Sequence, residues 1–126
     1  MRRILVTGAN KGIGYAIAER ILEEADDTFV LLGSRDLDRG EAAAQNLRRD
    51  GADRGDRIQT VEIDVSTDEA VIVAARQVRN ALGDDKLSGI VNQAGIGLGA
   101  NGLRSVLNVN TRGIRRVGDA IMTLVA

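Results

Sequence analysis

The sequence predicts an α/β fold, a doubly wound parallel sheet of about four strands and four helices. Two observations carry this prediction. Short apolar runs alternate with longer segments of helical periodicity, the pattern of consecutive strand–helix–strand units. A glycine-rich turn, Thr7–Gly14, joins the first apolar run to the first helical segment. Right-handed crossovers favour the strand order 3-2-1-4, with a ligand crevice beside the first strand. Residues 1–126 are expected to form one domain.

Four apolar runs are expected to be strands, because each is short and rich in aliphatic residues, as in a sheet covered on both faces. They are Ile4–Val6, Phe29–Leu32, Ile58–Ile63 and Leu87–Asn92. In the expected order the fourth run lies at an edge of the sheet, where one of its sides would be unpaired.

Four longer segments are expected to be helices. In the first, isoleucine recurs every fourth residue from Ile13 to Ile21, which predicts one buried aliphatic stripe. Asp36 can cap the second helix, and Ser66 with Glu69 fits a capping box at the start of the third. The segments are about Ile13–Glu24, Leu37–Arg49, Ser66–Leu82 and Leu103–Val125.

The composition excludes several classes of function. A formal net charge of -1 gives no electrostatic reason to expect binding to nucleic acid or to a membrane surface. The chain has no cysteine and no histidine, which removes thiolate chemistry, the usual general base and the commonest metal ligand. No apolar run approaches the ~20 residues that a membrane span requires. We therefore expect a cytoplasmic protein without a metal site.

The glycine-rich turn has the spacing of a phosphate-binding device. Gly8, Gly12 and Gly14 lie between a strand and a helix, where glycine lets the backbone turn tightly and approach a pyrophosphate. The charge of the pyrophosphate would meet free N–H groups at the positive end of the helix dipole. The alternative is an ordinary strand-to-helix turn with incidental glycines. The device predicts a dinucleotide ligand.

The residues after the second strand favour NADP(H) over NAD(H). An acid at this position would bind the adenosine 2'-hydroxyl, whereas an arginine favours a 2'-phosphate. Here Arg35 can donate two hydrogen bonds to phosphate oxygens, and Lys11 adds a second positive charge. Asp36 opposes this preference unless it serves as a helix cap. The alternative is that both cations are solvated surface residues.

Polar and small residues also follow the third and fourth strands. Asp64 is placed either to face the adenine amino group or to cap the next helix, and both alternatives stay open. Asn92 and Gln93 carry amides that could hold a neighbouring loop, while Ala94 and Gly95 are small enough for a flat ligand to lie close.

Five ordered motifs, TGANKGIG, GSRD, the Asp64–Val65 pair, NQAG and NVNTRG, run through the whole chain. In order and spacing they resemble the short-chain dehydrogenase/reductase family, which has a Rossmann-like fold. The first two motifs are most similar to the NADPH-dependent carbonyl reductases of that family. The chain would then correspond to the cofactor-binding portion and lack the C-terminal half of the family fold.

The resemblance implies a role for each matching residue. Those of the glycine loop would hold the pyrophosphate and the adenosine phosphate: Gly8, Asn10, Lys11, Gly12, Ile13 and Gly14. Those after the second and third strands would hold the 2'-phosphate and the adenine: Arg35, Asp64 and Val65. Those after the fourth strand would lie against the ribose and the nicotinamide: Asn92, Ala94 and Gly95. Asn110 would be the catalytic asparagine that helps a proton-relay water.

The sequence departs from the family in its chemistry. Gln93 stands where the family usually has a second asparagine. The family transfers hydride with a serine and a Tyr-x-x-x-Lys pair, but the single tyrosine here, Tyr15, is followed four residues later by Glu19. We therefore expect the NADP(H)-binding part of a carbonyl reductase-like oxidoreductase, inactive as this truncated chain. The alternative is a non-catalytic nucleotide-binding or interaction protein that forms a homo-oligomer through its exposed fourth strand.

Overall fold

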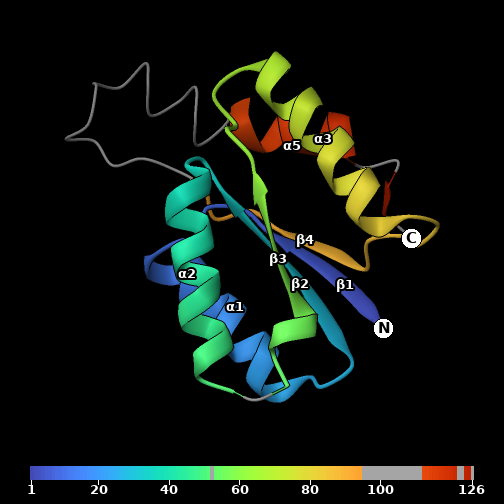
Figure 1. Cartoon of the computed structure of the whole chain (residues 1–126). Coiled ribbons are helices and arrows are strands. Elements are labelled where there is room, and N and C mark those ends of the chain that lie inside the picture. The colour runs from blue at the N-terminus through green and yellow to red at the C-terminus, as the bar shows by residue number, and fades with distance from the viewer. Residues whose placement is uncertain (52, 95–111, 122–123, 126) are drawn as a thin grey trace.

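A computed structural model describes residues 1–51, 53–94, 112–121 and 124–125 (Figure 1). Its centre is a parallel sheet with the strand order β3-β2-β1-β4, which confirms the predicted fold class and order. The strands are β1 (Arg2–Val6), β2 (Thr28–Ser34), β3 (Ile58–Glu62) and β4 (Gly89–Val91). The register pairs Leu5 of β1 with Leu31 of β2 and with Ile90 of β4.

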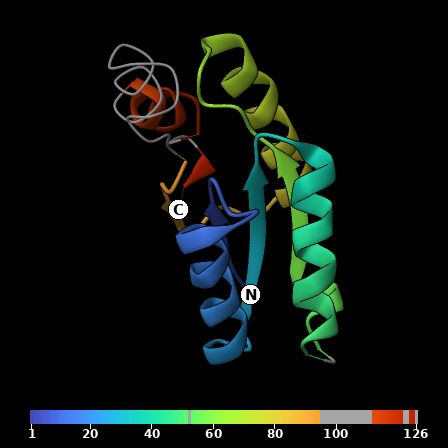
Figure 2. The same ribbon diagram turned by 90° about the vertical axis from the view of Figure 1, so that its left-hand side faces the viewer.

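Helices cover both faces of the sheet. On one face lie α1 and α2, which both pack against β2 (Figure 2), and on the other lie α3 and α5, which pack against each other (Figure 1). The described helices are α1 (Gly12–Glu24), α2 (Leu37–Arg49), the short 3-10 helix η1 (Gly55–Arg57), α3 (Asp68–Leu82) and α5 (Gly113–Ile121). In the described part of the chain, none of them is long and apolar enough to span a membrane.

Two aliphatic clusters, one on each face, hold these layers together. Alternation along β1 sends Leu5 to the cluster under α3 and α5, and Val6 to the cluster under α1 and α2. Leu31 and Leu32 divide in the same way on β2. Each of these four side chains is at most 1% exposed. Full burial of such a side chain contributes about 1.5–3 kcal/mol relative to exposure.

The predicted isoleucine stripe of α1 is wrong by one position. The buried residues of this helix are Gly14, Ala18 and Leu22, whereas Ile13 is 70% exposed. The small side chains at the buried positions let the start of α1 approach the glycine loop closely, since a Cβ on Gly14 would collide with the carbonyl oxygen of Gly8. Ile17 is only half-buried, and it lines a groove of about 490 Å³ beside β1.

The end of the last helix also differs from the prediction. Residues 103–111 of the predicted segment lie outside the described residues, and α5 ends at Ile121 and does not reach Val125. Val125 forms a parallel bridge with Leu87, and the Leu87 N–H donates to the carbonyl oxygen of Leu124 over 2.7 Å. The edge beyond β4 is therefore paired at the Leu87 end.

The third helix begins one residue later than the capping-box pattern predicts. Thr67, and not Ser66, is the N-cap of α3, and its hydroxyl accepts from the N–H of Ala70 over 3.2 Å. Ser66 is engaged with Asp64, to which its hydroxyl donates over 2.6 Å. Thr67 therefore caps α3, whereas the Ser66 hydroxyl is already bonded to Asp64 in the preceding turn.

Candidate dinucleotide-binding site

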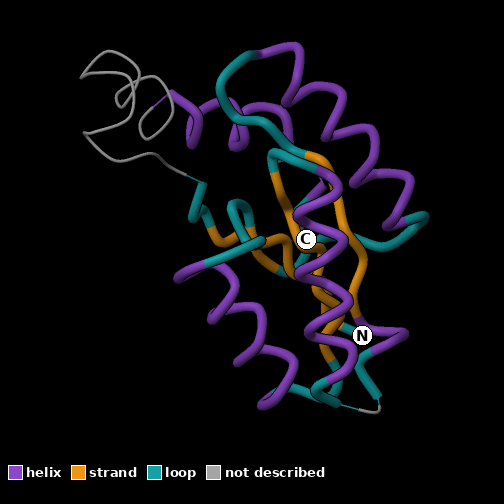
Figure 3. The backbone as a smooth tube through the Cα atoms, turned by 60° about the vertical axis from the view of Figure 1, so that its left-hand side comes forward, coloured by secondary structure: helices purple, strands orange, loops and turns teal. Residues whose placement is uncertain are grey.

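All four strands are parallel, so the loops that follow them leave the sheet at one end (Figure 3). The glycine loop follows β1, and Arg35 follows β2. Asp64 follows β3, and Asn92 follows β4. The predicted site residues that the structure describes therefore lie together at the carboxyl end of the parallel strands. The strand order reverses beside β1, where a ligand crevice is expected in an open α/β sheet.

The glycine loop has the backbone conformation that its sequence requires. Gly8 has a φ of 60° and Gly12 a φ of 63°, both in the left-handed region that favours glycine. The loop is tied to its neighbours because the N–H of Ala9 donates to the carbonyl oxygen of Gly33 over 2.8 Å. Asn10 is partly exposed and Lys11 is exposed, so both are accessible to a ligand at the start of α1.

The start of α1 differs from the starts of α2 and α3. Asp36 caps α2 by accepting from the N–H of Arg39 over 3.0 Å, which confirms its predicted capping role, and Thr67 caps α3. Within the described residues, the N-cap of α1, Lys11, makes no side-chain capping bond, and the first turn holds no acid. Among the residues that the structure describes, no side chain caps the first N–H groups of α1, as an anion site requires.

Thr7 connects the glycine loop to the loop after β4. Its side-chain oxygen accepts from the N–H groups of Gln93 and Ala94 over 3.0 and 3.1 Å, and it lies 3.4 Å from the carbonyl oxygen of Val91. Thr7 is 1% exposed. The loops after β1 and β4 are therefore held together by the Thr7 hydroxyl and the backbone of Gln93 and Ala94. The sequence signal for it was a hydroxyl residue directly before the first glycine.

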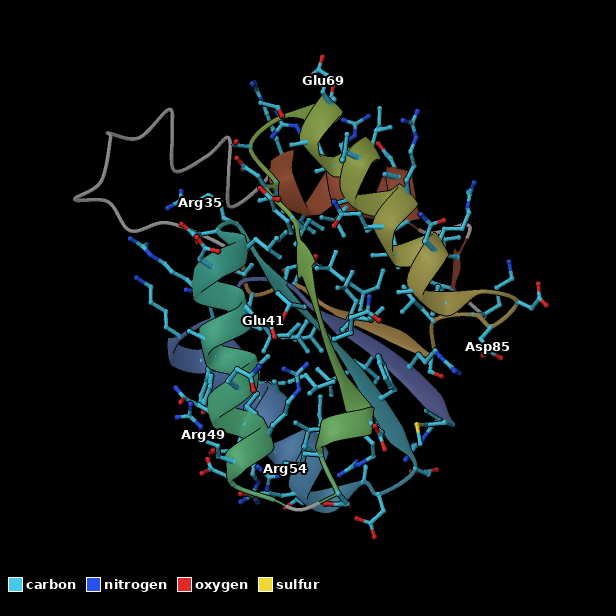
Figure 4. The ribbon with its side chains drawn as sticks, in the orientation of Figure 1. Arg35, Glu41, Arg49, Arg54, Glu69 and Asp85 are labelled. Carbon is cyan, nitrogen blue, oxygen red and sulfur yellow. The ribbon has the colours of Figure 1, made fainter. Side chains whose placement is uncertain are left out.

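Arg35 lies between the end of β2 and the N-cap of α2, with its side chain exposed (Figure 4). Because Asp36 uses one carboxylate oxygen, Oδ1, to cap α2, its simplest role is structural. This removes the main sequence argument against a 2'-phosphate beside Arg35.

After β3, Asp64 is not a helix cap, so that alternative is wrong. Its Oδ1 accepts from both the N–H and the hydroxyl of Ser66, over 2.9 and 2.6 Å. The side chain of Val65 is buried, and a Cβ on Gly113 would lie only 2.7 Å from its Cγ2. Any adenine contact from Val65 would therefore come from its backbone.

After β4, Asn92 is exposed, and Ala94 is half-buried beside Gly8 of the glycine loop. Gly95 and Asn110 lie outside the described residues. Tyr15 cannot stand in for a catalytic tyrosine. Burial, followed by the negative charges of Glu19 and Asp50, raises the pKa of the Tyr15 phenol, whereas an acid–base phenol needs a lowered pKa.

A parallel sheet, a left-handed glycine loop and an uncapped helix start define a dinucleotide-binding α/β domain. A family model described as short chain dehydrogenase matches residues 2–125. The chain belongs to this family of oxidoreductases, whose members bind a nicotinamide dinucleotide.

Relatives agree with this family assignment, and solved structures share the fold. A short-chain dehydrogenase/reductase of Aspergillus fumigatus is 38% identical over 93 residues, which are 73% of this chain and 33% of that protein. A menthone neomenthol reductase from Mentha piperita has a TM-score of 0.85 at 23% identity, covering 98% of this chain and 55% of that one. An NADPH-bound carbonyl reductase from chicken fatty liver has a TM-score of 0.80 at 25% identity, covering 98% and 48%. The chain thus spans between a third and about half the length of these proteins.

Proposed function

We propose that this chain is the NADP(H)-binding part of a short-chain oxidoreductase of the carbonyl reductase kind. The observation that carries the proposal is the uncapped start of α1 beside the glycine loop, with the Arg35 side chain exposed after the neighbouring strand. Amide groups of the loop would bind the pyrophosphate, and Asn10, Ile13 and Gly14 would contribute from the loop and the first turn. Nicotinamide then supplies the hydride chemistry of the family.

The preference for a 2'-phosphate rests on two cations and on one likeness. Arg35 and Lys11 are both exposed at the carboxyl end of the strands, where the adenosine would lie. The carbonyl reductase from chicken fatty liver was solved with NADPH. Asp64 and the Val65 backbone would then border the adenine, while Asn92, Ala94 and Gly95 would border the ribose and nicotinamide.

The 2'-phosphate is tested by replacing its proposed partner. Arg35→Ala should weaken NADPH binding about tenfold or more and leave NADH binding nearly unchanged, because a charge-assisted pair to the 2'-phosphate is removed. Fluorescence titration with each nucleotide measures both dissociation constants. Arg49→Ala is the matched control, since Arg49 is an exposed arginine at the other end of α2 (Figure 4). Equal weakening of both nucleotides by Arg35→Ala would refute the assignment.

We further propose that the chain by itself does not turn over a carbonyl substrate. It contains no Tyr-x-x-x-Lys pair, and general acid catalysis of the carbonyl oxygen contributes typically about 10²–10⁴-fold. NADPH oxidation by the intact chain, with an aromatic aldehyde or a quinone as acceptor, should stay at background. Turnover well above background would contradict this proposal. Asn110→Ala would then test the proton-relay role that the resemblance implies for Asn110.

A second proposal is self-association through the sheet edge. β4 pairs with β1 on its inner side, and on its outer side the described residues contribute only the single bridge at Leu87. A second copy could pair along Gly89–Val91 and extend the sheet. Sedimentation velocity over a concentration series measures this, and a monomer at the highest concentration would contradict it.

A further inference from the structure

A side-chain hydrogen bond of Ser34 joins the two residues on either side of Arg35. The Ser34 hydroxyl donates to the carbonyl oxygen of Asp36 over 2.7 Å, so the hydrogen bond spans the one residue between them. Ser34 is fully buried, and water therefore does not compete for its hydroxyl. A hydrogen bond with a buried donor restricts the backbone on both sides of Arg35.

Both residues of this hydrogen bond, Ser34 and Asp36, are also bonded to the rest of the fold. At the sheet end, the carbonyl oxygen of Ser34 accepts from the N–H of Ile63 over 2.8 Å. At the helix end, the carbonyl oxygen of Asp36 also accepts from the N–H of Gly40 over 3.0 Å, and the Asp36 carboxylate caps α2. Arg35 is thus held between two anchored residues while its own side chain is exposed.

Close packing of α2 against Ser34 further restricts the backbone around Arg35. A Cβ on Gly40 would lie 2.7 Å from the Cβ of Ser34 and 2.8 Å from Cγ2 of Thr60. Only a glycine lets the first turn of α2 come this near to β2. The direction in which the Cα–Cβ bond of Arg35 points is therefore set by contacts that do not involve the Arg35 side chain.

We propose that Ser34 is the residue that positions Arg35 and thereby sets the preference for a 2'-phosphorylated dinucleotide. The inference rests on the proposed function, because it assigns a second residue to the same subsite. An exposed arginine loses rotamer freedom when it binds a phosphate, and a backbone already fixed by Ser34 reduces what must still be ordered. Ser34 acts through Arg35 and does not touch the phosphate, since its hydroxyl is buried and donates to Asp36.

The first measurement compares two nucleotides on one variant. Ser34→Ala should raise the dissociation constant of NADPH about fivefold, because binding must then order the backbone around Arg35, and leave that of NADH unchanged. The NADH constant also reports whether the variant is folded. Thr28→Val is the matched control, because Thr28 is a buried hydroxyl at the opposite end of β2 whose Oγ1 finds no partner among the described residues. It should change neither constant.

The second measurement places Ser34→Ala in the Arg35→Ala background. If Ser34 acts through Arg35, the added substitution should have no further effect on NADPH binding. A further loss there, or an equal loss for NADPH and NADH in the single variant, or an unchanged ratio of the two constants, would overturn the inference. A wild-type chain that binds NADH as tightly as NADPH would instead refute the proposed 2'-phosphate preference itself.

Discussion

Gly8→Ala should weaken the binding of both NADPH and NADH by at least about 100-fold. Two independent costs arise at this residue. Its φ of 60° is in the left-handed region, where an L side chain costs about 1–2 kcal/mol. A Cβ there would also lie 2.8 Å from three backbone atoms of Gln93 and Ala94. Because backbone and not a flexible side chain is in the way, the loops after β1 and β4 must separate.

The control for Gly8→Ala is an alanine at a glycine with open space. A Cβ on Gly118 of α5 would meet no described atom within 4 Å, so Gly118→Ala should preserve nucleotide binding. Fluorescence titration on both variants measures the difference. If Gly8→Ala bound NADPH within about threefold of the wild-type chain, close approach of these loops would not be required for binding, contrary to the site geometry.

Arg57→Met should lower the free energy of unfolding by about 3 kcal/mol, or about 1 kcal/mol for each hydrogen bond removed. The Arg57 guanidinium is buried and donates to the carbonyl oxygens of Leu22, Ala25 and Thr28 over 2.7, 2.9 and 3.1 Å. It therefore ties the end of α1 to the beginning of β2. Methionine keeps most of the length of the side chain but removes the guanidinium donor from all three carbonyls.

Urea denaturation measures this effect, with Arg2→Met as the control. Arg2 forms an ion pair with Asp27 over 3.0 Å, but the two side chains are 59% and 68% exposed. Exposed pairs of this kind contribute about 0–1 kcal/mol. Comparable destabilisation by the two substitutions would show that burial of Arg57 is not what makes its hydrogen bonds important.

The sequence predicted those features of the fold that depend on local pattern. The alternation of apolar runs with helical segments, the glycine loop and the Asp36 cap all reappear in the structure, because each is determined by neighbouring residues. The buried face of α1 could not be predicted from isoleucine periodicity. Helix–sheet distance decides that face, and it places Gly14 and Ala18 inward with Ile13 outward. Likewise, the pairing of Val125 with Leu87 depends on residues far apart in the chain.

The candidate site follows the same division. The parallel sheet places Lys11, Arg35 and Asp64 at the carboxyl end of the strands, as their positions after successive strands indicated. The position of Thr7 directly before the first glycine is visible in the sequence, but the partners of its buried hydroxyl are not. Thr7 bonds to a loop more than eighty residues away. Only the folded structure reveals such a contact.

Direct titration with nicotinamide nucleotides tests the central claim, that the start of α1 and the glycine loop bind a dinucleotide. The chain has one tyrosine and no tryptophan, so the fluorescence of NADPH itself can be followed with little background from the protein. We predict saturable binding at a single site, tighter for NADPH than for NADH. The absence of a saturable signal with both fluorescent nucleotides, NADPH and NADH, would contradict the claim.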